Sequence, residues 1–98
     1  MAEADSLSDL GEAYLGLGRV SEAVDALTPS LAIWQDIGDR HGLAATLLRL
    51  GRAQQEAGDT EQAYDLLSQA AALFDELGDR AQAAEARSAL VANVRRSS

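Results

Sequence analysis

The sequence predicts an all-α protein: a right-handed solenoid of five helices, built as two helix-turn-helix repeats and a C-terminal capping helix. The first observation is an internal repeat. Shifted by 40 positions, the chain overlays Leu10-Gly11 on Leu50-Gly51 and Leu27 on Leu67. The second is the Gly-Asp pair that recurs at 38–39, 58–59 and 78–79; glycine typically ends one helix and aspartate caps the next. A repeat of this length is typical of solenoids, whose units stack side by side.

Composition limits the chain to one small domain and argues against nucleic acids and membranes as direct partners. Its 98 residues are 47% hydrophobic, contain no cysteine and no lysine, and carry a net charge of −8. Nucleic acids and anionic membranes are bound mainly by clustered basic residues, so we expect neither direct nucleic-acid nor membrane binding. No apolar stretch approaches the roughly 20 residues of a membrane span. We expect a cytoplasmic protein whose residues 1–98 form a single domain.

Repeat one is predicted over residues 4–38. Residues 1–5 are acidic and expected to fray. Leucine and tyrosine at helical spacing predict a first helix over 6–17, and a second apolar stripe predicts a helix over 21–37. Pro29 interrupts the second stripe, so we expect a kink near this residue.

Repeat two is predicted over residues 39–78, with helices over 40–57 and 60–77, and the capping helix over 79–96. The capping helix is more polar than its equivalents: Arg87 and Val91 stand where helix 40–57 has Leu47 and Gly51. A polar last helix is typical of the end of a solenoid. Glycine within a helix costs about 1 kcal/mol against alanine, so Gly11 and Gly51 predict close helix contacts.

These features resemble the tetratricopeptide repeat, in which helix A carries a Leu-Gly pair and helix B carries small residues. The matching residues in the two units are Leu10, Gly11, Tyr14, Ala23 and Leu27, then Leu50, Gly51, Ala63, Leu67 and Ala70. The period of 40 exceeds the family's 34, so the helices are expected to be longer by about a turn. Long repeats with a Gly-Asp-Arg turn look like those of multidomain transcriptional regulators of bacteria, especially actinobacteria.

The resemblance implies a concave groove lined by the A helices, which binds a peptide or a partner helix. Carried over position by position, the groove candidates on the first helix are Asp5, Ser8, Asp9 and Glu12. Of all the positions carried over, we expect the partner to contact Ser8, Glu12, Leu48, Arg49, Arg52, Gln55 and Glu56.

Three of these positions have alternative interpretations. Arg49 and Arg52 either meet an acidic group of a partner, or Arg52 pairs with Glu56 one turn later and Arg49 is solvated. Leu48 either anchors a ligand or rests against the first or fifth helix.

Nothing in the sequence predicts catalysis. His41 is the only histidine, and a metal site usually takes three or four ligands. No nucleophile elbow and no phosphate-binding glycine loop is present. We therefore expect no enzyme, no metal and no cofactor.

The sequence thus predicts a protein–protein interaction module of a larger bacterial transcriptional regulator, with a protein, a peptide or another domain of the parent protein as its partner. Two alternatives stay open. The chain is a self-association element that forms a homodimer through exposed stacking faces or by swapping, or it is a sensor domain that binds a small ligand in the groove.

Overall fold

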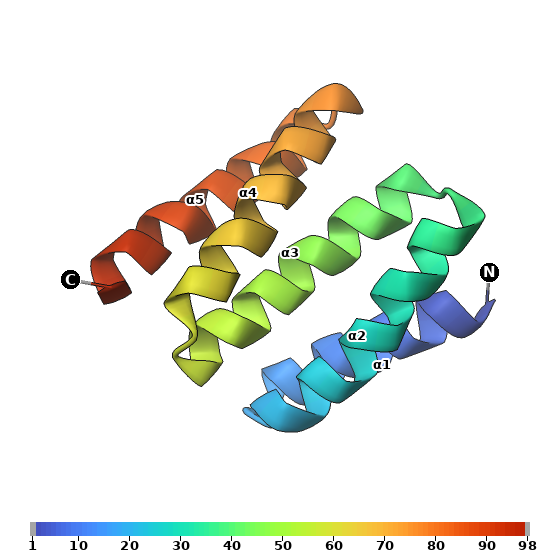
Figure 1. Ribbon diagram of the computed structural model, residues 1–98, viewed down its shortest axis with the longest axis horizontal. Coiled ribbons are helices and arrows are strands. Elements are labelled where there is room, and N and C mark those ends of the chain that lie inside the picture. Colours follow the sequence, from blue (N-terminus) through green and yellow to red (C-terminus); the bar gives the residue numbers. More distant parts are fainter. Residues whose placement is uncertain (1, 98) are drawn as a thin grey trace.

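The computed structural model describes residues 2–97, which form five α-helices and measure 39 × 31 × 18 Å overall. Each helix packs against the next one along the chain (Figure 1). The helices are α1 (Ala2–Gly16), α2 (Val20–Ile37), α3 (Arg40–Ala57), α4 (Thr60–Glu76) and α5 (Arg80–Ser97). The predicted all-α architecture, with its five helices, is confirmed.

The array is curved, with α1, α3 and α5 on its inner side. Helix α3 touches both α1 and α5, whereas no contact joins α2 to α4 in the part of the chain described. Odd-numbered helices that approach each other, beside even-numbered helices that do not, place the concave surface along α1, α3 and α5.

The turns follow from the recurring Gly-Asp pair. The glycines at 18, 38, 58 and 78 all have φ between 73° and 88°, the left-handed conformation that ends a helix at little cost for glycine. Asp39, Asp59 and Asp79 then accept hydrogen bonds from the backbone N–H three residues later, at 2.9, 3.2 and 3.1 Å. These bonds satisfy N–H groups that the first helical turn leaves free.

The start of the first helix differs from the prediction. Helix α1 begins at Ala2, not near Ser6, and Ala4 is fully buried. The buried hydroxyl of Ser30 in α2 donates a hydrogen bond to the Ala4 carbonyl at 2.9 Å. The prediction of a frayed segment over residues 2–5 was wrong because a serine 26 positions away holds it.

Helix α2 continues through Pro29 as one element, and Figure 1 shows it bending near its middle. Pro29 has no N–H to donate to the carbonyl four residues earlier. Pro29 is exposed. Next to it, the hydroxyl of Thr28 donates to the carbonyl of Val24 at 2.8 Å.

Two helix glycines set the spacing within the repeats. A Cβ added at Gly11 would lie 2.4 Å from Cγ of Leu27, and one added at Gly51 would lie 2.7 Å from Cδ2 of Leu67. Both leucines are fully buried. The missing side chain is therefore the space into which the following helix inserts its leucine, and this confirms the predicted close contacts.

Replacing Gly51 by leucine is expected to destabilise the protein by about 1–3 kcal/mol, because the new side chain overpacks the contact with Leu67. The free energy of unfolding in urea measures the effect. Gly16 is the matched control: it ends α1, and a Cβ added there would meet nothing within 4 Å. Gly16→Ala should leave stability unchanged or raise it by about 0.5–1 kcal/mol. An unchanged unfolding midpoint for Gly51→Leu would contradict the packing described.

Candidate partner-binding groove

The concave face has two adjoining hollows, which together we call the inner groove. The larger, of about 340 Å³, lies between α1 and α3; the smaller, of about 110 Å³, lies between α1, α3 and α5. Ala45 and Arg49 line both. The remaining lining residues are Asp5, Ser8, Asp9, Trp34, Asp39, His41, Gly42 and Thr46 in the larger hollow, and Glu12, Leu48, Arg52, Gln82 and Glu85 in the smaller one.

Arg49 joins α1 to α3 across the groove. Its guanidinium lies 3.3 Å from the carboxylate of Glu12 and donates a hydrogen bond to the hydroxyl of Ser8. Ser8 is buried, and its Oγ also lies 3.4 Å from Oγ1 of Thr46. The alternative in which Arg49 is simply solvated is wrong, because its guanidinium forms an ion pair with Glu12.

Two further ion pairs join α3 to α5. Arg52 lies 2.9 Å from Glu85, and Glu56 lies 3.1 Å from Arg96. The expected pairing of Arg52 with Glu56 along α3 is therefore not formed; each residue has a partner on the next inner helix. All four side chains are partly exposed, so these pairs contribute modestly to stability. They do, however, reduce the free positive charge in the groove.

Leu48 belongs to the core. It contributes to the lining of the smaller hollow, yet it is only 4% exposed and lies in the main hydrophobic cluster. Of its two interpretations, packing against neighbouring helices is the one that the structure shows.

Gln55 is also buried and works inside the fold. Its side-chain N–H donates to the carbonyl of Ala89 at 3.0 Å, and the same atom lies 3.5 Å from Oδ1 of Asn93. Asn93 in turn donates to the carbonyl of Thr60 at 2.9 Å. Gln55 therefore fastens α5 to α3, and it is not placed to meet a partner.

Two groove candidates carried over on the first helix, Asp5 and Asp9, lie at the N-terminal end of α1. Asp5 and Asp9 are exposed, line the larger hollow and form no ion pair within residues 2–97. The period of 40 overlays Asp9 on Arg49 and Glu12 on Arg52, yet Arg49 pairs with Glu12 and Arg52 with Glu85. Opposite charges at equivalent positions therefore indicate that neighbouring inner helices attract each other, but not which side chains pair.

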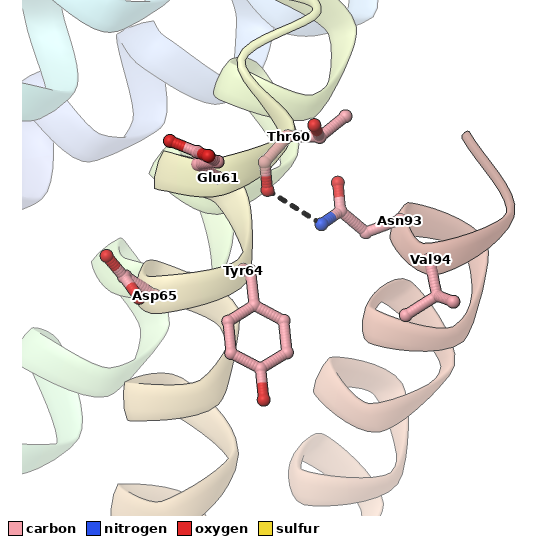
Figure 2. Close-up of a pocket in the computed structure, with 6 residues that line it drawn as sticks. All are labelled: Thr60, Glu61, Tyr64, Asp65, Asn93 and Val94. Atoms are coloured by element: carbon pink, nitrogen blue, oxygen red, sulfur yellow. Dashed lines mark hydrogen bonds between the residues drawn. The ribbon is translucent and has the colours of Figure 1, made fainter. Parts of the chain in front are cut away.

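Another surface hollow lies between the start of α4 and the end of α5. It has a volume of about 690 Å³ and is lined by Thr60, Glu61, Tyr64, Asp65, Asn93 and Val94. Figure 2 shows Tyr64 projecting between the two helices, while Glu61 and Asp65 point away from α5. Both carboxylates therefore lie on the side of α4 that faces away from α5.

His41 contacts two residues of the same fold, Asp79 and Phe74. Its Nε2 lies 3.4 Å from the carboxylate of Asp79, and its ring stands edge-on to Phe74 with centroids 6.0 Å apart. Among the residues described, no three His, Asp or Glu side chains are grouped so that they could hold a metal ion. Within residues 2–97, no helix combines the length and apolarity required to cross a bilayer.

Because Leu48 is buried, Leu48→Glu is expected to unfold the protein and not to disturb a binding surface alone. Burying an unpaired carboxylate and deleting a core side chain together cost several kcal/mol, a large share of the stability of a domain this size. Circular dichroism at 25 °C and urea unfolding measure the loss. Leu77→Glu, at a leucine that is 39% exposed, is the control and should remain helical. A helical Leu48→Glu variant with wild-type stability would show that the site is not core.

Comparison with known proteins agrees with this geometry. No curated protein matches the chain. A family model described as tetratricopeptide repeat matches residues 2–76, which covers α1 to α4 and leaves α5 outside the match. With paired helices, small residues at the close contacts and a curved array, the chain belongs to the tetratricopeptide repeat family.

Proposed function

We propose that this chain is a non-catalytic binding module that holds a protein segment, a peptide or a partner helix, in the inner groove. Tetratricopeptide repeats generally mediate protein–protein interaction, and the family is not enzymatic. The observation that carries the proposal is the larger hollow between α1 and α3, whose lining includes the small side chain of Ala45. A helix or an extended peptide fits a groove of this kind.

The charges of the groove favour a basic partner. Arg49 and Arg52 are paired with Glu12 and Glu85, so neither offers a free cation to an acidic peptide. Asp5 and Asp9 remain exposed and unpaired within residues 2–97. Complementary charge at the rim increases the association rate and selects the partner. We therefore expect a segment that places lysine or arginine beside the start of α1.

Of the predicted groove residues, Glu12, Arg52 and Glu56 stay partly exposed, each within an ion pair, and Glu12 and Arg52 line the smaller hollow. Ser8, Arg49 and Gln55 link the inner helices through hydrogen bonds and an ion pair. Leu48 is a core residue that lines the smaller hollow. The setting follows from the sequence: we propose a single domain over residues 1–98, within a larger bacterial regulator in the cytoplasm.

A peptide-display selection against the immobilised chain tests the proposal. We expect enriched sequences that are rich in lysine or arginine and that lose at least about tenfold in affinity, or 1.4 kcal/mol, on the variant Ala45→Arg, which fills the groove. Ala32→Arg is the matched control, because Ala32 is an exposed alanine of α2 that lines neither hollow. Enriched peptides that bind Ala45→Arg and the unmodified chain equally would place the binding surface outside the groove.

A further inference from the structure

Within residues 2–97, one buried side-chain N or O atom lacks a hydrogen-bond partner, the indole Nε1 of Trp34. Trp34 is the only tryptophan of the sequence and is 5% exposed. It belongs to α2, yet it contributes to the lining of the larger hollow, between α1 and α3. A buried N–H group without an acceptor lowers stability, so its presence in a folded protein requires an explanation.

Core packing explains the aromatic ring of Trp34 but not its N–H group. Phe74 stands at the equivalent position of the second repeat and is fully buried, with no polar atom in its side chain. Gly42 makes room for the larger indole, because a Cβ added there would lie 2.5 Å from Cδ2 and Cε3 of the ring. The second repeat has Gln82 in place of this glycine. The tryptophan–glycine pair therefore occurs only beside the larger hollow.

The charges of the same hollow decide which kind of acceptor can reach the indole. Asp5 and Asp9 are exposed carboxylates one helical turn apart, and neither forms an ion pair within residues 2–97. Arg49 is the arginine of this lining, and its charge is balanced by Glu12. An anionic acceptor is therefore repelled, whereas a cation is attracted. The acceptor that suits Trp34 is neutral and lies beside a positive charge.

A basic protein segment carries both groups, but only in one backbone conformation. Its neutral acceptors are the backbone carbonyls, and its cations are the side chains of lysine or arginine. An α-helix uses its carbonyls in its own hydrogen bonds and leaves only those of its last turn free. An extended segment keeps its carbonyls available to a donor on the protein that binds it. The indole N–H of Trp34 therefore favours an extended segment over a helix.

From these observations we propose that Trp34 determines the specificity of the larger hollow, by donating a hydrogen bond from Nε1 to a backbone carbonyl of an extended, basic segment. Asp5 and Asp9 hold the lysine or arginine beside that carbonyl. The inference rests on the proposed function and selects one of its two occupants, the extended peptide. Because Nε1 has almost no accessible surface in the chain alone, the acceptor reaches it when a neighbouring side chain changes its rotamer. The N–H group therefore reports whether the hollow is occupied.

Nuclear magnetic resonance of the whole chain tests the proposal directly, because a single tryptophan gives a single indole N–H signal. The extended probe is a capped peptide of alternating arginine and proline, in which proline prevents a helix. The helical probe is an alanine-rich peptide of about 15–18 residues with the same number of arginines. We expect the extended probe to move the indole proton downfield, as a new hydrogen bond does. It should also bind at least about tenfold more tightly than the helical probe.

Three variants separate the hydrogen bond from the charges. Trp34→Phe removes the N–H group and keeps an aromatic ring, and it should weaken the extended probe about tenfold and the helical probe by less than about twofold. Asp5→Asn and Asp9→Asn should each weaken both probes about two- to fivefold, the size of an exposed ion pair. Asp65→Asn is the matched control, because Asp65 is exposed on α4 and lines neither hollow of the groove. It should leave both affinities unchanged.

Circular dichroism and urea unfolding should show that each variant remains folded. If Trp34→Phe does not fold, the indole signal of the unmodified chain still decides the question, because that measurement needs no substitution at this position.

Three outcomes would overturn the proposal: an indole signal that saturating extended probe leaves in place, equal affinity for the two probes, or a loss on Trp34→Phe that is the same for both. Ala45→Arg, which fills the groove, distinguishes this failure from failure of the proposed function. If the helical probe binds, loses affinity on Ala45→Arg and does not move the indole signal, the groove binds a helix and the role of Trp34 is wrong. If neither probe binds, both proposals are wrong.

Discussion

The contact between a glycine of one helix and a leucine of the next determines how closely the helices of each repeat lie. At Gly11 and Gly51 there is no room for even a Cβ atom, because Leu27 and Leu67 fill the space. Glycine lowers helix stability by about 1 kcal/mol against alanine, so burial of the leucine has to offset that cost. The remaining architecture follows from this spacing, because two closely paired helices present a continuous apolar side to the next pair.

An apolar glycine–leucine contact joins the two helices of each repeat, whereas polar side chains join the inner helices α1, α3 and α5 to one another. Arg49 bridges to α1 and Arg52 to α5, while Gln55 and Asn93 make buried hydrogen bonds near the chain's end. The ion pairs that join the inner helices across the groove therefore balance the charges of Arg49 and Arg52. What stays uncompensated is the acidic start of α1, and this is why the proposed partner is basic.

Much of the fold could be predicted from the sequence because its signals are local. The turn glycines and the capping aspartates act within three or four residues, and the repeat doubles each observation. The ordered start of α1 was missed because the hydrogen bond to the carbonyl of Ala4 comes from Ser30, far along the chain. Leu48 and Gln55 were assigned to the groove by family position, yet both are buried: Leu48 lines the smaller hollow as part of the core, and Gln55 bonds to α5. Charge pairing between inner helices needs the three-dimensional register: Arg49 overlays on Asp9 but pairs with Glu12, and Arg52 overlays on Glu12 but pairs with Glu85.

A double-mutant cycle on Gly11 and Leu27 tests the central contact most directly. Gly11→Ala is measured by urea unfolding in the unmodified chain and again in the Leu27→Ala background, where the space is free. We predict that alanine at position 11 destabilises the unmodified chain but is neutral or stabilising once Leu27 is truncated, with a coupling energy of about 1 kcal/mol or more. Additive effects, within about 0.3–0.5 kcal/mol, would show that the two residues do not share one space and would contradict the account.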